Sequence, residues 1–281
     1  MAYPTVSAPY GLKPINLIGG QVFAGSTREL PIQYGYATNI FYGDFVVLSR
    51  GFATRAAVST GTGSNQVTGV FLGCSYTNPL TKQKTFSQYW PASTLAGDAV
   101  AIVCDDPDTV FKAVVCSSGT TVASGGLALI GTNLSMIDNS TGNVNTGDST
   151  NAVLAPTATP VTSILPVRCV GVVPDTSYSF AATGSSSTTA ITLTGTGTPQ
   201  AIPVGASVGY LASNGQLINT GSFVATAAVA GATSVTMNAA IAVPGSVTAI
   251  PASSTIVFTV YPEILVKMNL LVHGYYSSTT A

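Results

Sequence analysis

The sequence predicts an all-β protein, because strand-like runs and turn residues alternate along the chain and helical patterns are almost missing. Short runs rich in Val, Ile, Thr, Tyr and Phe are separated by Gly, Pro, Asn and Asp at intervals of about ten residues. Glycine interrupts these runs too often for amphipathic helices of ordinary length. Strands are expected at residues 39–49, 68–77, 98–104, 109–115, 165–173 and 263–276, and one short helix within 121–130.

A glycine motif opens three of the expected strands. Glycine, a small or acidic residue, any residue and valine follow one another at residues 43–46, 97–100 and 205–208. The glycine permits a tight turn with positive φ, and the next side chain can satisfy exposed backbone groups before the strand begins. The motif is typical of a β-barrel or sandwich, and its unequal intervals argue against a solenoid repeat.

The distribution of charge predicts the domains. Residues 176–262 contain no Asp, Glu, Lys or Arg, although their β periodicity continues. We therefore expect a small uncharged β-sandwich domain at residues 179–260, inserted into a main β domain of residues 17–178 and 261–281. The main domain is expected to be a discontinuous β-barrel or sandwich. Residues 1–16 contain three prolines and are expected to form an extended N-terminal arm that lies on a neighbouring molecule.

Composition restricts the possible functions. Nine basic and ten acidic residues give a net charge of -1, which excludes a basic nucleic-acid-binding protein. The single histidine, His273, is expected to be a structural residue at a strand end. With so few acid, base and metal-ligating groups, we expect no enzyme, no cofactor and no metal. The charged fraction is only 7%, against about 25% in ordinary soluble proteins, and this favours a permanently assembled protein.

The four cysteines, Cys74, Cys104, Cys116 and Cys169, form no CxxC pair. If residues 99–104 and 109–116 form a hairpin, the sulfurs of Cys104 and Cys116 lie more than about 20 Å apart. A disulfide needs Cα atoms within about 7 Å. We therefore expect four free and mostly buried thiols.

Three carboxylates, those of Asp105, Asp106 and Asp108, lie within four residues beside Pro107. Such a cluster can contribute oxygen ligands to calcium, but the glycine-containing spacing of calcium loops is missing. Asp-Pro is also an ordinary turn former. A hairpin turn is the preferred interpretation, and the sequence leaves open whether the cluster binds a cation.

Neither a signal peptide nor a membrane span is expected. The first five residues lack the basic and apolar regions of a secretion signal. Nothing approaches about 18 consecutive apolar residues. The protein is therefore expected to remain in the cell that makes it.

Aromatic residues are concentrated in the first ninety residues, which hold Trp90 and seven of the twelve tyrosines. Tyr and Trp are favoured both in cores and in interfaces, and both interpretations stay open. Together with the arm, this concentration suggests that contacts with neighbouring molecules involve Tyr3, Pro4, Tyr10, Lys13, Arg28, Tyr34 and Tyr36.

Several long segments resemble the head decoration, or cement, proteins of tailed bacteriophages, most of all those infecting aquatic cyanobacteria. The likeness is carried by APYGLKPINLIGGQVFAGSTRELPI (8–32), NIFYGDFVVLSRG (39–51), GVFLGCSYTNP (69–79), CDDPDTVFKAVV (104–115) and PEILVKMN (262–269). It implies a β-rich viral structural protein without disulfides, made in the host cytoplasm and bound in many copies to the outer capsid surface of the virion. The implied partners are the major capsid protein and further copies of the chain, commonly as a homotrimer.

One alternative function stays open. A tail or fibre adhesin would bind host surface glycans through the uncharged Thr/Ser-rich domain. A major capsid protein is disfavoured, because that fold needs a long helix that this sequence cannot supply.

Overall fold

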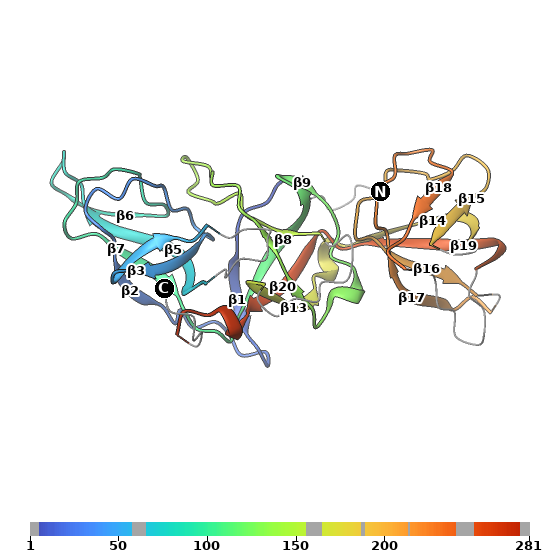
Figure 1. Cartoon of the computed structure of the whole chain (residues 1–281), viewed down its shortest axis with the longest axis horizontal. Helices are drawn as coiled ribbons and strands as arrows, with labels where there is room; N and C mark the ends of the chain where they lie inside the picture. The colour runs from blue at the N-terminus through green and yellow to red at the C-terminus, as the bar shows by residue number, and fades with distance from the viewer. Residues whose placement is uncertain are drawn as a thin grey trace.

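The fold is nearly all β, which confirms the predicted fold class. The computed structural model describes residues 6–57, 66–155, 165–186, 189–212, 214–239 and 250–275. Its strands form three sheets that lie in a row along the long axis of the molecule (Figure 1). The helices among these residues are three short 3₁₀ turns, η1 (Leu127–Leu129), η2 (Pro174–Thr176) and η3 (Leu270–Val272).

The N-terminal sheet lies at one end of the row. Its strands are β2 (Arg28–Pro31), β3 (Phe45–Ser49), β4 (Phe52–Arg55), β5 (Gly69–Thr77), β6 (Lys84–Ser87) and β7 (Val100–Cys104). They follow the order β2-β7-β5-β3-β4, and β6 pairs with β5. Val46, Phe71 and Trp90 are fully buried in one cluster. Of the two roles left open for the aromatic residues, core and interface, Trp90 therefore has the core role.

The central sheet combines strands from both ends of the chain. Its strands are β1 (Lys13–Leu17), β8 (Thr109–Ser118), β9 (Thr121–Val122), β10 (Asn133–Leu134), β11 (Met136–Ile137), β12 (Ala152–Leu154), β13 (Val167–Val172) and β20 (Glu263–Met268). They follow the order β10-β13-β20-β8-β12-β11, and β1 and β9 also pair with β8. Only Ser135 separates β10 from β11, yet these strands pair at opposite ends of the order. The sheet therefore curls into a nearly closed barrel.

Strand β8 has two buried faces, as its apolar sequence requires. Phe111, Ala113 and Val115 belong to the cluster inside the barrel, whereas Val114 and Cys116 belong to a smaller cluster on the other face. Successive side chains of a strand point to opposite faces. A strand that is covered on both sides therefore reads as a continuous apolar run.

The third sheet is formed by the uncharged part of the chain. Its strands are β14 (Tyr178–Ser186), β15 (Ala190–Leu193), β16 (Ser207–Leu211), β17 (Leu217–Phe223), β18 (Ser234–Thr236) and β19 (Ile250–Val260). They follow the order β17-β16-β19-β14-β15-β18 around their own apolar core. A bridge from Val224 to Met237 joins the two ends, so the strands form one nearly closed sheet. The boundaries 179–260 of an inserted domain stay a prediction.

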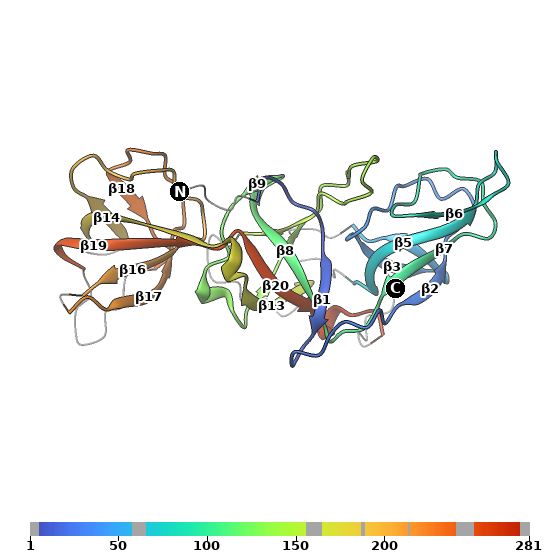
Figure 2. The same ribbon diagram turned by 180° about the vertical axis from the view of Figure 1, so that it is seen from behind.

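The chain passes between the central and third sheets along two neighbouring strands. Val172 of β13 pairs with Ile264 of β20, and Tyr178 of β14 pairs with Val260 of β19. Figure 2 shows these four strands meeting at the narrow junction between the two sheets.

The prediction that residues 99–104 and 109–116 form a hairpin is wrong. Strand β7 lies in the N-terminal sheet between β2 and β5, whereas β8 pairs with β20 in the central sheet. Residues 105–108 therefore connect two sheets. Apolar strands that are buried on both faces pair equally well with distant strands, and a short connection does not decide between these possibilities.

The expectation that residues 1–16 form an extended arm on a neighbouring molecule is wrong for the end of this segment. Residues 13–17 form β1, which pairs antiparallel with β8 (Figure 2). Leu12 is fully buried in the central core. Tyr3 and Pro4, two of the expected contact residues, lie outside the described residues.

The expected helix within residues 121–130 is reduced to the three residues of η1, and β9 occupies its first part. Gly126 precedes η1 with φ 58°, a conformation that a regular helix does not contain. Gly126 therefore prevents the helix from extending toward residue 121, and η1 is limited to one turn.

Candidate interaction surfaces

Tyr10 and Lys13, two expected contact residues, lie together over the central barrel. The Tyr10 hydroxyl donates a hydrogen bond to Oε1 of Glu263, whose carboxylate is almost fully buried. Lys112 Nζ lies 3.2 Å from the same oxygen, and Lys13 Nζ lies 4.7 Å from the centre of the Tyr10 ring. Burial and the neighbouring Glu263 raise the pKa of Tyr10. The Tyr10 side chain is therefore engaged within its own chain.

Arg28 belongs to a second cluster, at the boundary between the N-terminal and central sheets. Its Nε atom lies 2.8 Å from Oδ2 of Asp105, and the Tyr275 hydroxyl donates to the same oxygen at 3.0 Å. His273 is fully buried beside them, with Nε2 3.2 Å from the Asp105 carbonyl oxygen. Burial lowers the pKa of His273. His273 follows η3 and forms a β-bridge with Val67. It therefore lies at the end of a 3₁₀ turn and not, as expected, at the end of a strand, because β20 already ends at Met268.

Tyr34 and Tyr36 have different environments. Tyr34 is 61% exposed. Tyr36 packs against the core of the N-terminal sheet, its hydroxyl accepts from the Arg55 backbone N–H at 3.0 Å, and its carbonyl oxygen accepts from Trp90 Nε1 at 3.3 Å. Of the two tyrosines, Tyr34 is therefore the one available for an intermolecular contact.

The carboxylates of the acidic cluster, Asp105, Asp106 and Asp108, are all engaged in contacts within the chain. Oδ1 of Asp106 accepts from the Asp108 backbone N–H at 2.9 Å, and Asp108 Oδ1 lies 3.1 Å from Lys267 Nζ. Asp105 pairs with Arg28, as described above. The segment turns at Pro107 and Asp108. In the parts of the chain that the structure describes, no group of three or more His, Cys, Asp or Glu residues is placed to hold a metal ion.

A buried polar network around Asp44 could not be found from the sequence. Asp44 accepts hydrogen bonds from Ser149 Oγ at 2.5 Å and Asn151 Nδ2 at 2.9 Å, and it pairs with Arg55 at 3.3 Å. Arg55 also pairs with Asp138. Ser149 and Asn151 lie about a hundred residues from Asp44 in the sequence, so no local sequence pattern predicts these contacts. The network ties the N-terminal sheet to the loop that precedes β12.

All four cysteines are free and buried, as predicted. Burial raises the pKa of Cys74 to about 12 and the pKa values of Cys116 and Cys169 to about 11. Thiols with such pKa values are protonated and weakly nucleophilic at neutral pH.

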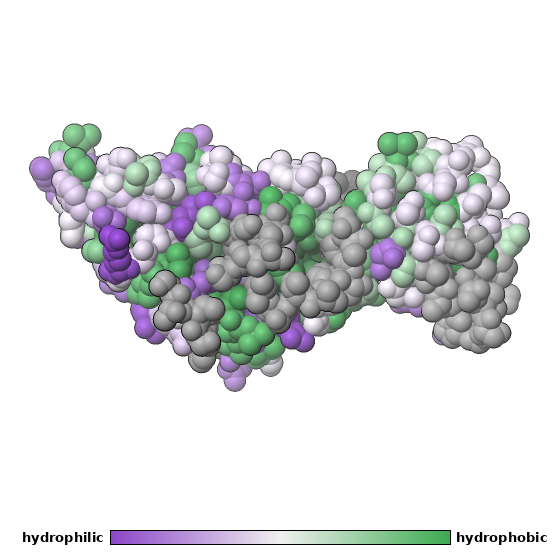
Figure 3. Space-filling model, viewed as in Figure 1, coloured by the Kyte–Doolittle hydropathy of each residue, from purple (hydrophilic) through white to green (hydrophobic). Residues whose placement is uncertain are grey.

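Large apolar side chains are exposed on each of the three sheets or beside them. The hairpin formed by β5 and β6 carries Leu80 in its loop and Phe86 on β6, which are 90% and 78% exposed. Figure 3 shows apolar atoms at the outer tip of the N-terminal sheet and below the central barrel over η3, where Leu270 and Leu271 are exposed. These residues are not covered by the chain itself.

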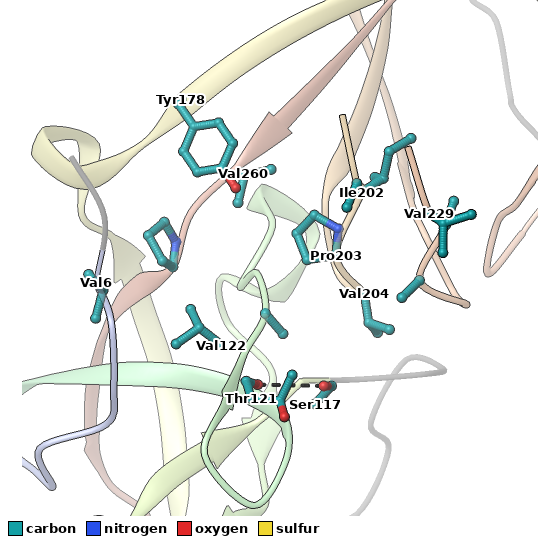
Figure 4. Close-up of a pocket in the computed structure, with 15 residues that line it drawn as sticks. Val6, Ser117, Thr121, Val122, Tyr178, Ile202, Pro203, Val204, Val229 and Val260 are labelled. Atoms are coloured by element: carbon teal, nitrogen blue, oxygen red, sulfur yellow. Dashed lines mark hydrogen bonds between the residues drawn. The ribbon is translucent and has the colours of Figure 1, made fainter. Parts of the chain in front are cut away.

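An apolar cavity of about 450 Å³ lies at the junction between the central and third sheets. Its walls include Val122 from β9, Tyr178 and Val260 from the connecting strands, and Val204 and Val229 from loops of the third sheet (Figure 4). Sequence analysis missed this cavity because its walls come from segments that are distant along the chain.

Comparisons with family models, with curated proteins and with solved structures found no match to this chain. Within the described ranges, none of the helices has the length and apolar character needed to cross a membrane.

Proposed function

We propose that this chain is a viral structural protein that decorates the outer surface of a tailed-phage capsid. The observation that carries the proposal is the exposure of Leu80, Phe86 and Leu271 on a chain in which only 7% of residues are charged. Contiguous exposed apolar patches that are rimmed by polar residues are typical of protein interaction sites. The segments that resemble phage decoration proteins support the same assignment.

Decoration stabilises a shell by mass action. A protein that binds only the assembled shell shifts the equilibrium toward that state by RT ln(1 + [L]/Kd). Many copies on a symmetric lattice add their effects, and contacts between neighbouring copies raise the effective concentration of each. Trimers of the chain, bound to the major capsid protein, would supply both kinds of contact.

The hairpin that carries Leu80 and Phe86 is the contact surface that we propose. It projects at the outer end of the N-terminal sheet (Figure 1), and Tyr34 is exposed on a loop of the same sheet. Burying one Leu or Phe side chain contributes about 1.5–3 kcal/mol. With both side chains buried, the binding constant for the shell is therefore expected to be at least tenfold higher than without them.

Co-sedimentation with shells assembled from the cognate major capsid protein tests this proposal. The wild-type chain is expected to saturate the shells, and the double variant Leu80→Ser/Phe86→Ser to bind at least tenfold more weakly. Val144→Ser, which changes an exposed apolar residue elsewhere, is the control. If the wild-type chain does not bind shells, the proposed function is wrong. If the double variant binds as tightly as wild type, the contact lies on another surface.

The adhesin alternative has less support from the third sheet. Glycan sites usually combine exposed aromatic rings with polar or charged partners. Between residues 179 and 260, the described aromatic side chains of Tyr210, Phe223 and Phe258 are buried, and Phe180 stacks on Phe258. Binding of the chain to immobilised host glycans, with no binding to shells, would favour the adhesin.

A further inference from the structure

The cavity at the junction between the central and third sheets is built from segments far apart in the sequence. Val6 and Val122 belong to the first half of the chain, Tyr178 and Val260 to the connecting strands, and Ile202 to a loop of the third sheet. Figure 4 shows the side chains of these residues gathered around the same space. The cavity therefore exists only when both sheets are folded and docked.

Hydrogen bonds beside the cavity connect the central sheet with the third sheet and with the segment that joins β19 to β20. Ser124 N–H donates to the Val204 carbonyl oxygen at 2.9 Å, and Gly125 N–H donates to the Tyr261 carbonyl oxygen at 2.8 Å. The Tyr261 N–H donates to Ser124 Oγ at 2.9 Å. Three bonds across the junction keep the walls in place without a ligand. A preformed site avoids the free energy cost of ordering its walls on binding.

The walls of the cavity are mostly apolar. None of the lining residues is charged, and the polar side chains among them are those of Ser117, Thr121 and Tyr178. Ser117 Oγ already donates to the Thr121 carbonyl oxygen at 3.5 Å. The cavity of about 450 Å³ is partly open to solvent. Its apolar walls offer few hydrogen-bond partners to the water molecules that lie against them.

We propose that this junction cavity binds a neutral, largely apolar small molecule. Its volume lies within the range of about 300–1,000 Å³ that is typical of small-molecule sites. An apolar molecule displaces poorly bonded water, which favours binding. A carboxylate or ammonium group would lose its hydration against walls that hold no opposite charge, which opposes binding. The site thus selects for neutral ligands, and this holds whether or not the chain decorates capsids.

Such a ligand would contact both sheets at once. It would contact Val122 and Val204 on opposite sides of the junction, so binding would stabilise their relative orientation. Because the unfolded chain has no such cavity, the ligand also raises the thermal midpoint with increasing concentration.

Titration of the full chain with N-phenyl-1-naphthylamine, a neutral apolar fluorophore, tests the proposal. The expected result is a saturable rise in fluorescence at one probe per chain. Competition with 1-decanol is expected to reverse it, whereas decanoate at the same concentration should compete at least tenfold less well. Wild type without a saturable signal, or equal competition by alcohol and carboxylate, would overturn the proposal.

A matched pair of variants places the probe in the cavity. Ala201 is an exposed residue that lines the cavity, and Ala181 on β14 is also exposed but is not among the lining residues. Ala201→Trp is expected to weaken probe binding at least tenfold, and Ala181→Trp to leave it unchanged, while both keep the wild-type circular dichroism spectrum. Equal affinities for the two variants would place the probe elsewhere and overturn the assignment. So would probe binding that falls as the chain is concentrated, because a second copy would then occupy the cavity.

Discussion

The hydroxyl of Tyr10 donates a hydrogen bond to Glu263 across 253 positions of the sequence. This bond joins the segment before β1 to the first residue of β20, on the outside of the central barrel. Oε2 of Glu263 is buried and has no hydrogen-bond partner among the described residues. The Glu263 carboxylate therefore relies on Tyr10 and Lys112.

Replacing Tyr10 by Phe is expected to destabilise the chain by about 1–3 kcal/mol. The change removes a hydrogen bond to a buried carboxylate and leaves that group less satisfied. Urea denaturation followed by circular dichroism measures the effect. Tyr34→Phe is the control, since Tyr34 is exposed and its variant should stay within about 0.5 kcal/mol of wild type. Equal effects of the two variants would show that the bond to Glu263 contributes nothing.

Leu12→Ala is expected to cost about 2–5 kcal/mol, because Leu12 is fully buried in the central core and its truncation leaves a cavity. Val22→Ala, at an exposed position, is expected to be nearly neutral. Deletion of residues 1–16 should likewise unfold the central barrel and not merely remove an arm. Thermal unfolding of the three proteins checks this; a deletion variant with the wild-type midpoint would contradict it.

Gly205→Ala is expected to destabilise the junction more than Gly215→Ala. Both glycines have positive φ, 84° and 81°, so both variants pay about 1–2 kcal/mol for the left-handed conformation. Only at Gly205 would the new Cβ collide with a neighbour, the Ser124 carbonyl oxygen, whereas nothing lies within 4 Å at Gly215. Differential scanning calorimetry measures the difference, and equal midpoints would show that the close approach is absent.

Stability is expected to fall as the pH rises from about 8.5 toward 11. Cys74, Cys116 and Cys169 have pKa values of about 12, 11 and 11 in the fold, whereas an exposed thiol has a pKa of about 8.5. Between these values the unfolded chain has lost protons that the folded chain retains. Each thiol then removes about 1.4 kcal/mol of stability per pH unit.

Denaturant midpoints at pH 7, 8, 9 and 10 measure this fall. Cys116→Ala is expected to start from a lower stability and to show a shallower slope, since one titrating group is missing. An unchanged slope in this variant would assign the alkaline loss of stability to other groups.

Capsid binding is expected to depend weakly on salt. The apolar anchors Leu80 and Phe86 are not screened, and exposed ion pairs such as that of Lys84 with Asp98 contribute only about 0–1 kcal/mol each. The amount of chain bound to the shells should therefore change less than threefold between 0.05 M and 1 M NaCl. At 1 M the Debye length is only about 3 Å, so exposed charges are largely screened. Release of the chain at high salt would indicate an electrostatic contact.

The sequence by itself determined the all-β class, the burial of the four free thiols and the location of the strands of the third sheet in the uncharged stretch. These properties follow from local patterns, because strand periodicity, turn residues and apolar runs depend on neighbours in the chain. The glycine motif was informative for the same reason, since a strand follows it at all three positions. Gly43 and Gly205 have the expected positive φ, whereas Gly97 does not.

Only the tertiary structure decided which strands pair. It placed β7 and β8 in different sheets, paired β1 with β8, and brought Ser149 to Asp44 and Tyr10 to Glu263. It also formed the cavity between the central and third sheets. Each of these features depends on the pairing of segments distant along the chain, and many such pairings bury similar apolar area. The free energy of the complete packed arrangement selects among them, and no single segment carries that information.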